Sequence, residues 1–304
     1  MSINFNGRVA IVTGAGGGLG RLYALALAAR GAKVVVNDLG VARDGSGTSS
    51  AAADAVVREI VAAGGEAIAS GASVTDFDAV QAMVAQAADA WGRVDILVNN
   101  AGILRDKTFA KMDLADFRLV VEVHLMGAVH CTKAVWPLMT AQKYGRIVMT
   151  TSSTGLYGNF GQSNYGAAKL AQVGLMQTLA LEGAKHGIRV NALAPTAHTR
   201  MTEDLLPAPM LEAFRPEAVV PALLVLASED APTRAILCAG AGAVEAAHIT
   251  LTRGQWIGLG ADAPERLAAQ LGDVMNRDGE IAPADGSAQG RQEVALAMAR
   301  MTPA

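Results

Sequence analysis

A tyrosine and a lysine stand four residues apart in the stretch SNYGAAK, at Tyr165 and Lys169. On an α-helix this spacing brings both side chains to one face. A free phenol has a pKa of about 10, which is too high for efficient proton transfer at neutral pH, and a neighbouring ammonium group lowers that pKa by stabilising the phenolate. The two residues are therefore candidates for an acid–base pair. The alternative is that they lie on an ordinary amphipathic helix without a catalytic role. Other motifs in the chain distinguish these two interpretations.

A pair of serines precedes the tyrosine. Ser152 lies 13 residues before Tyr165, and Ser153 lies 12 residues before it. A hydroxyl group held beside the phenol would orient the oxygen of an alcohol or carbonyl substrate. The spacing alone does not determine which of the two serines has this role.

The segment TGAGGGLG, residues 13–20, joins an apolar run to a helical segment. A chain that turns sharply from strand into helix needs positions without a Cβ atom, and a phosphate group needs close approach to the N–H groups at the positive end of the helix. A plain tight turn is the alternative. The position between strand and helix favours binding of a dinucleotide. The candidate residues of this turn are Gly14, Gly18, Leu19 and Gly20.

Asp38 stands 24 residues after Gly14, directly after the next apolar run. A carboxylate at this place accepts hydrogen bonds from the adenosine ribose of NAD and repels the 2′-phosphate of NADP. Arg43, five residues later, would weaken this preference if its loop folded back. Asp38 therefore predicts NAD as the cofactor, and its alternative role is to cap a loop.

Short apolar runs alternate with longer segments of helical spacing along the chain. The expected strands cover residues 9–13, 33–38, 94–100, 145–151 and 188–193, with weaker candidates at 66–70 and 235–240. The expected helices cover residues 19–30, 49–65, 76–92, 114–139 and 164–187. Repeated strand–helix–strand units form a parallel sheet that is covered on both faces. We expect an α/β fold: a single doubly wound, Rossmann-type domain over residues 1–253, with a helical C-terminal extension over 254–304 that is not an independent domain.

The composition excludes several other classes of protein. Of the 304 residues 51% are hydrophobic, so the chain is not a disordered one, and the net charge of −3 favours neither nucleic acid nor an acidic membrane surface. Two cysteines without a CxxC motif or a histidine cluster predict neither disulfides nor a metal site. The N-terminal segment does not resemble a signal peptide, and no apolar run approaches the roughly 18 residues that span a bilayer. We expect a cytoplasmic protein without nucleic-acid or membrane partners.

Four motifs, in their order and spacing, resemble the short-chain dehydrogenase/reductase family. They are TGAGGGLG at 13–20, NNAG at 99–102, the serine pair at 152–153 and YGAAK at 165–169. The resemblance covers roughly residues 5–240. Finer stretches, above all GLYGNFGQ at 155–162, are similar to the (3R)-hydroxyacyl-CoA dehydrogenase domain of peroxisomal multifunctional β-oxidation enzymes. The resemblance implies an NAD-dependent oxidoreductase of fatty acid metabolism.

The resemblance also implies roles for single residues. Tyr165 is the acid–base group, and Lys169 lowers its pKa and binds the nicotinamide ribose. Ser152, at the spacing that is usual in the family, holds the substrate oxygen, and Ser153 stays the alternative. The remaining cofactor contacts that it implies are Ser73, Val74, Asn100, Ala101, Gly102, Pro195 and Thr199.

His124 stands where many members of the family have an asparagine. The asparagine keeps a small kink in its helix and a water molecule linked to the lysine. We interpret His124 as a positioned structural residue and not as a general base. Its presence leaves open whether the proton relay of the asparagine operates here.

The substrate that the resemblance implies is a small molecule, a (3R)-hydroxyacyl-CoA, oxidised at its secondary alcohol or formed in the reverse reaction. A hydroxysteroid or general carbonyl reductase is the alternative enzyme, and a dinucleotide-binding sensor without turnover is the alternative of another class. Residues 199–221 are expected to form a lid whose apolar side chains suit such a substrate. Small residues along the helix at 164–187 favour a homodimer or homotetramer.

Overall fold

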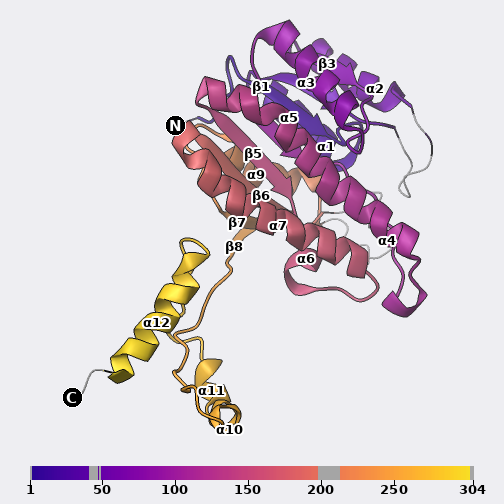
Figure 1. Cartoon of the computed structure of the whole chain (residues 1–304). Helices are drawn as coiled ribbons and strands as arrows, with labels where there is room; N and C mark the ends of the chain where they lie inside the picture. The colour runs from indigo at the N-terminus through magenta and orange to yellow at the C-terminus, as the bar shows by residue number, and fades with distance from the viewer. Residues whose placement is uncertain (1, 41–46, 48, 198–212, 302–304) are drawn as a thin grey trace. The chain divides into compact units, whose positions relative to one another are not determined.

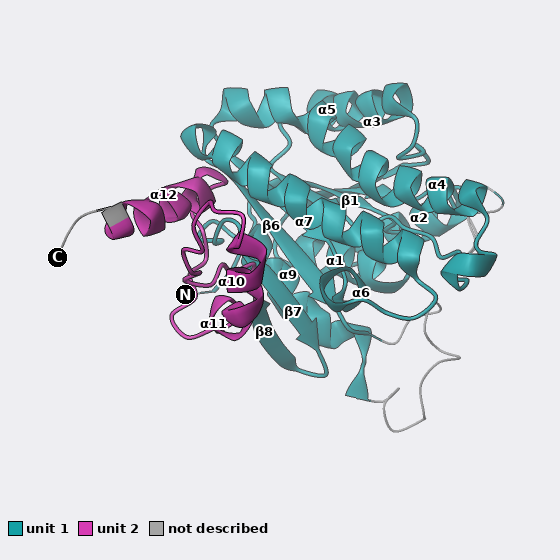
Figure 2. Ribbon diagram, turned by 60° about the horizontal axis from the view of Figure 1, so that its bottom comes forward, with its two compact units in different colours: residues 1–246 teal, residues 247–304 magenta. Residues whose placement is uncertain are grey.

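The computed structural model describes residues 2–40, 47, 49–197 and 213–301. These residues form two compact units, 1–246 and 247–304 (Figure 2). The first unit ends seven residues before the predicted boundary at 253. That the second unit is only an extension and not an independent domain stays a prediction.

An eight-stranded sheet forms the centre of the first unit, in the order β3-β2-β1-β4-β5-β6-β7-β8 (Figure 1). The pairs from β3 to β7 are all parallel. The strands are β1 (Val9–Thr13), β2 (Lys33–Asn37), β3 (Glu66–Ser70), β4 (Ile96–Asn99), β5 (Gly145–Thr150), β6 (Ile188–Pro195), β7 (Ile236–Gly240) and β8 (Ala243–Ala247). The first seven lie where the apolar runs predicted them. The predicted doubly wound α/β class is confirmed.

Helices connect these strands and cover both faces of the sheet. Helix α1 contacts both α2 and α9, and α3 packs on α5. Figure 2 shows α5 and α7 on one face of the sheet and α9 on the other. The helical elements of this unit are α1 (Gly18–Ala28), α2 (Ala51–Ala62), α3 (Phe77–Trp91), η1 (Phe109–Lys111), α4 (Leu114–Val121), η2 (Glu122–Met126), α5 (Gly127–Gln142), α6 (Ser153–Tyr157), α7 (Ser163–Gly183), η3 (Ala184–His186), η5 (Pro216–Val219) and α9 (Val220–Ala227).

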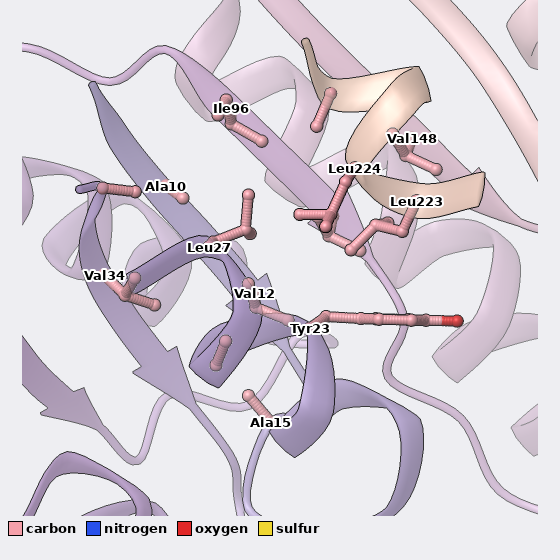
Figure 3. Packing of buried hydrophobic residues seen from close by; sticks show 14 of the residues in the cluster. Ala10, Val12, Ala15, Tyr23, Leu27, Val34, Ile96, Val148, Leu223 and Leu224 are labelled. Carbon is pink, nitrogen blue, oxygen red and sulfur yellow. The ribbon is translucent and has the colours of Figure 1, made fainter. Parts of the chain in front are cut away.

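Apolar side chains from both layers fill the space between the sheet and the helices of one face (Figure 3). Val12 and Val34 project from β1 and β2, Tyr23 and Leu27 from α1, and Leu223 from α9, and all are fully buried. This core holds α1 against β1 and β2. The turn between β1 and α1 is thereby fixed at the edge of the sheet.

The long helix predicted over residues 114–139 is interrupted. It consists of α4 and α5 joined by η2, a π-helical turn over Glu122–Met126. The hydrogen bond from the Gly127 N–H group to the Glu122 carbonyl spans five residues instead of four. The turn adds one residue to the helix and lies directly against α7.

Strand β8 was not predicted. It follows β7 after Ala241 and Gly242, whose φ angles of 51° and 81° fit a two-residue hairpin turn. Its side chains are mostly exposed, so its sequence lacks the apolar run that marks a buried strand.

The second unit contains three helices among its described residues. They are α10 (Ala263–Ala269), α11 (Leu271–Val274) and α12 (Ser287–Met301). An isolated antiparallel bridge joins Leu251 to Ile281. The helical pattern predicted for this part of the chain is present.

Candidate active site

The parallel strands bring their carboxyl ends to one edge of the sheet, where ligands bind in folds of this class. Strands β1, β4 and β5 are neighbours and end at Thr13, Asn99 and Thr150. The glycine turn, the NNAG segment and the serine pair follow these three strands directly. Motifs that are far apart in the sequence therefore meet at one edge.

The structure brings Ser152, Tyr165 and Lys169 together. Ser152 is buried and caps α6, because its Oγ atom accepts a hydrogen bond from the Thr154 N–H group over 3.1 Å. The side chain of Ser152 also lies close enough to Tyr165 to lower the pKa of its phenol. The buried Nζ atom of Lys169 donates to the Thr150 carbonyl over 2.5 Å and lies 5.6 Å from the centre of the Tyr165 ring. Ser153, the alternative serine, is exposed.

The pKa values of this group differ from the expectation. Burial lowers the pKa of Lys169 to about 7. The pKa of Tyr165 is raised, first by burial and then by the carboxylate of Asp106, while the side chain of Ser152 acts in the opposite direction. That Lys169 lowers the pKa of Tyr165 stays a prediction, because burial, Ser152 and Asp106 are the causes of the observed shift. Burial removes the water that would stabilise the phenolate, and this is the largest cause of the raised pKa.

His124 lies inside η2 and is buried. Its Nε2 atom is 2.8 Å from the carbonyl oxygen of Ile103, and its ring meets the Tyr165 ring edge-on at 90°, with the centroids 5.2 Å apart. Burial and the charge of Lys169 lower the pKa of His124 to about 3. The imidazole is therefore neutral at physiological pH, in agreement with the positioned structural residue that we expected.

The glycine turn and the segment after β4 are packed backbone to backbone. Gly14 has a φ angle of +63°, and a Cβ atom on it would lie 2.9 Å from Cα of Ala101. A Cβ atom on Gly20 would lie 2.2 Å from the Gly14 carbonyl oxygen. The side-chain amide of Asn100 donates to the carbonyl groups of Thr13 and Gly14 over 2.9 and 3.1 Å. The turn therefore requires glycine at these places and leaves the close approach that a diphosphate needs.

Asp38 follows β2 and lies beside this turn. Its Oδ2 atom accepts a hydrogen bond from the Gly16 N–H group over 2.8 Å, and its Oδ1 atom accepts one from the Gly40 N–H group over 2.7 Å. The carboxylate thus caps the loop, the role held as the alternative, and also stands at the position predicted for the ribose. Each oxygen accepts only one of these bonds, so each keeps acceptor capacity for a ribose hydroxyl. Arg43 lies outside the described residues.

The remaining predicted cofactor residues line the same edge of the sheet where they are described. Ser73 and Val74 follow β3, and Val74 packs against Gly127, on which a Cβ atom would lie 2.7 Å from Val74 Cγ2. Pro195 ends β6. Gly102 lies against the ring of His124. Thr199 and the part of the expected lid up to residue 212 lie outside the described part of the chain.

Several residues that shape the site were not among the predicted site residues. Thr13 accepts hydrogen bonds on its Oγ1 atom from the N–H groups of Asn100 and Ala101, each over 3.0 Å. The carboxylate of Asp106 accepts from the side-chain amide of Gln162 over 2.8 Å and acts on Tyr165. Gln172 is buried below Lys169 on α7. Only the position of Thr13 at the end of a strand carried a signal that could have identified it.

Within residues 2–40, 47, 49–197 and 213–301, no three histidine, cysteine, aspartate or glutamate side chains gather where they could hold a metal ion. No helix among them is long and apolar enough to cross a membrane.

The chain is similar to curated proteins of about its own length and to much longer, multifunctional proteins. The chain is 54% identical over 239 residues to a short-chain type dehydrogenase/reductase of Mycobacterium tuberculosis, which covers 78% of this chain and 84% of that protein. It is 54% identical over 229 residues to the peroxisomal hydratase-dehydrogenase-epimerase of Saccharomyces cerevisiae, which covers 75% of this chain but 25% of the yeast protein. The chain therefore spans about a quarter of the length of this multifunctional relative.

Two solved structures share the fold. The full-length peroxisomal multifunctional enzyme type 2 from Drosophila melanogaster matches with a TM-score of 0.79 and 36% identity, over 97% of this chain and 50% of that one. A 7α-hydroxysteroid dehydrogenase complexed with NADH and 7-oxo glycochenodeoxycholic acid matches with a TM-score of 0.71 and 31% identity, over 79% of this chain and 95% of that one.

The sequence model of the short chain dehydrogenase family matches residues 8–209, which is more than half of the chain. This span includes the glycine turn, the serine pair, and the tyrosine and lysine of α7. The chain therefore belongs to the short-chain dehydrogenase/reductase family and is an oxidoreductase that acts on CH–OH groups.

Proposed function

We propose that the chain is an NAD-dependent oxidoreductase that transfers hydride between nicotinamide and a (3R)-hydroxyacyl-CoA. The observation that carries this proposal is that Ser152 and the ring of Tyr165 lie next to the buried amine of Lys169, at the edge of the sheet where the glycine turn lies. These three side chains have the chemistry needed to remove or return the proton of an alcohol.

The cofactor fits the residues that are present. A diphosphate would lie on the turn from Gly14 to Gly20, where a Cβ atom would collide with backbone. Asp38 would accept hydrogen bonds from the adenosine ribose, and its negative charge favours NAD over NADP. The solved relative that contains NADH supports the same choice. When bound, NAD supplies the ring that accepts hydride from the alcohol carbon.

The side chains of the site would divide the remaining work. In the oxidation, Tyr165 takes the hydroxyl proton of the alcohol while hydride leaves the carbon, and the product is a ketone. Ser152 donates a hydrogen bond to the substrate oxygen and orients it. Lys169 binds the nicotinamide ribose, and the positive charge of oxidised nicotinamide lowers the pKa of Tyr165 against the effect of burial.

Two observations support an acyl thioester as the substrate. The segment at 155–162 between Ser152 and α7 is similar to the corresponding segment of hydroxyacyl-CoA dehydrogenases, and a relative with 54% identity carries dehydrogenase in its name beside hydratase and epimerase. The segment also exposes apolar side chains, with Tyr157 71% and Phe160 87% exposed, which suit an acyl chain.

A hydroxysteroid or general carbonyl reductase is the second candidate. The solved 7α-hydroxysteroid dehydrogenase favours it, because that protein is complexed with 7-oxo glycochenodeoxycholic acid on a fold that matches with a TM-score of 0.71. A sensor that binds the dinucleotide without turnover is the candidate of another class, and it has no need of Ser152, Tyr165 and Lys169.

A substrate screen separates the candidates. The purified chain is incubated with NAD and either (R)- or (S)-3-hydroxyacyl-CoAs of several lengths, or hydroxysteroids, and NADH absorbance is followed. Turnover of the (R)-thioesters above the others is the expected result. Faster turnover of steroids would favour the second candidate, and NADH binding without any turnover would favour the sensor.

The assembly and the location belong to the same proposal. We expect a homodimer or homotetramer, which sedimentation velocity measures directly. The predicted cytoplasmic location is tested by fractionation of the source cells.

A further inference from the structure

One face of helix α7 carries three polar side chains in succession. Tyr165, Lys169 and Gln172 stand at positions i, i+4 and i+7, which is the spacing of a single helix face. Lys169 is 2% exposed and Gln172 is 1% exposed. A buried amide costs free energy unless it is hydrogen-bonded, so Gln172 needs a specific partner.

The partner of Gln172 is the backbone of the π-helical turn. Its Nε2 atom donates a hydrogen bond of 2.6 Å to the carbonyl oxygen of His124, the central residue of η2. A π-turn replaces the regular hydrogen bonds of the helix by longer-range ones and frees backbone groups for other partners. Gln172 thus attaches α7 to η2 one turn below Lys169.

The side chain of His124 contacts two parts of the proposed site, the segment after β4 and the ring of Tyr165. Its Nε2 atom is 2.8 Å from the Ile103 carbonyl oxygen, in the segment after β4 that holds the predicted cofactor residues. The other side of the ring is in edge-on contact with Tyr165. The pKa of His124 is about 3, so the ring is neutral and its position depends on packing and hydrogen bonds, not on charge.

Gln172 stands in polar surroundings. Its Oε1 atom, Nδ1 of His124 and Oδ1 of Asn99 are buried. The three residues line one small cavity, together with Thr13. A polar side chain at 172 therefore suits both this cavity and the His124 carbonyl to which its Nε2 atom donates.

We propose that Gln172 is a positioning residue of the reaction, which acts by holding His124 between the phenol of Tyr165 and the cofactor segment at Ile103. The hydrogen bond to the His124 carbonyl sets the position of η2. The ring of His124 then sets the distance from Tyr165 to the Ile103 backbone, which follows the predicted cofactor residues Asn100, Ala101 and Gly102. This inference rests on the proposed function for the identity of the reaction, but not for the contacts themselves.

The test replaces the amide by an apolar side chain of equal length, in Gln172→Met. The control is Gln177→Met on the same helix, whose Oε1 atom accepts from Arg234 away from the site. We expect kcat for oxidation of the best (R)-3-hydroxyacyl-CoA to fall about tenfold in Gln172→Met, with KM for the thioester within about twofold, because orientation is lost and not substrate contact. The control keeps kcat within about twofold.

The melting temperature separates positioning from a merely structural role. The proposal is overturned if Gln172→Met keeps kcat within twofold of the wild type. It is also overturned if the variant has a lower melting temperature and regains wild-type kcat when both proteins are assayed at a correspondingly lower temperature. If Gln172→Met does not fold, Gln172→Leu takes its place under the same criteria.

A second measurement does not depend on turnover. In the protein labelled with 15N-histidine, the ring nitrogens of His124 are assigned by their loss in His124→Asn and compared between wild type and Gln172→Met. We expect the 15N chemical shifts of the His124 ring to change in Gln172→Met and to remain unchanged in Gln177→Met. Unchanged shifts in Gln172→Met would overturn the proposal. Absence of any turnover in the wild type would refute the proposed function. The 15N comparison would still show whether Gln172 positions the ring of His124.

Discussion

The ring of His124 stands perpendicular to the ring of Tyr165, and its Nε2 atom contacts the Ile103 backbone. An edge-to-face contact at a centroid distance of 5.2 Å lies within the range that aromatic pairs prefer. The neutral imidazole limits the movement of the phenol without competing for its proton. The contact supports the proposal that the histidine serves orientation and that Tyr165 carries the acid–base chemistry.

Tyr165→Phe removes the proton-transfer group and keeps the ring. We expect kcat to fall by about 10²–10⁴-fold, which is the usual contribution of a general acid or base, while NADH binding changes little. Turnover is followed by absorbance and binding by NADH fluorescence. Tyr144→Phe is the control, because Tyr144 precedes β5 at the opposite edge of the sheet. A Tyr165→Phe variant with wild-type kcat would refute the assignment.

Asp106→Asn tests the electrostatics at the same phenol. The carboxylate of Asp106 raises the pKa of Tyr165, so removal of its charge lowers that pKa. Oxidation requires the deprotonated phenol, and the rising part of the pH profile of kcat/KM should therefore move to lower pH. The profile is measured between about pH 6 and pH 10, with Asp89→Asn on the exposed side of α3 as a control. A shift toward higher pH would contradict the prediction.

Lys169→Met should make the protein more stable and inactive. The pKa of Lys169 is lowered from 10.5 to about 7, so below pH 7 the amine is charged in both the folded and the unfolded state and the folded state carries the full cost of burial. Above pH 10.5 the amine is neutral in both states and this cost is absent. We expect the free energy of unfolding to rise by about 2–4 kcal/mol at pH 6, after loss of the bond to Thr150 is allowed for, and the gain to vanish toward pH 10.5.

Denaturant titration of both proteins at several pH values measures this gain. A Lys169→Met variant that is less stable than wild type at pH 6 would show that the desolvation cost is small. Loss of activity together with higher stability would mark Lys169 as a residue kept for function.

Asp38→Asn tests the basis of cofactor choice. The amide keeps the size of the side chain but removes the charge that repels a 2′-phosphate. We expect the ratio of kcat/KM for NAD to that for NADP to fall by about tenfold or more, since juxtaposed like charges cost several kcal/mol. Steady-state rates with each cofactor give the ratio. An unchanged ratio would mean that Asp38 only caps the loop.

Gly102→Ala tests the packing of His124. An added Cβ atom would lie 2.2 Å from Cε1 of the buried ring, and we expect the free energy of unfolding to fall by about 1–3 kcal/mol. The same change should cost less in a His124→Ala background, because the obstructing ring is gone. Gly290→Ala on α12 has open space around its added Cβ atom and is the control. Equal costs in both backgrounds would contradict the predicted clash.

Much of the fold could be predicted because its signals are local. Seven strands were predicted from apolar runs. The helix predicted over 76–92 begins as expected, because Asp76 caps α3 and accepts from the Ala79 N–H group over 3.1 Å. The residues proposed for chemistry lie in motifs that follow strands directly, so the meeting of Ser152 with Tyr165 followed from their order in the chain.

Other features depend on contacts that the sequence does not express. Gln172 in a helix resembles an ordinary surface residue, and only the tertiary structure reveals that it is buried against η2. The raised pKa of Tyr165 depends on how completely the site excludes water, which spacing alone does not determine. A single extra residue in a helix leaves its apolar pattern almost unchanged, so this pattern did not reveal η2, and only the family resemblance pointed to a kink at the place of His124.

That extra residue also decides which faces of α4 and α5 point inward. Each residue of an α-helix turns the chain by about 100°, so deletion of one residue from 122–126 would rotate everything from Gly127 to Gln142 by that angle relative to α4. Helix α4 packs on α7, whereas α5 packs on α3, and no single uninterrupted register serves both neighbours. An alignment of this chain with a relative of different length in this segment should therefore keep insertions and deletions out of it, because the spacing here is as constrained as the identity of the residues around it.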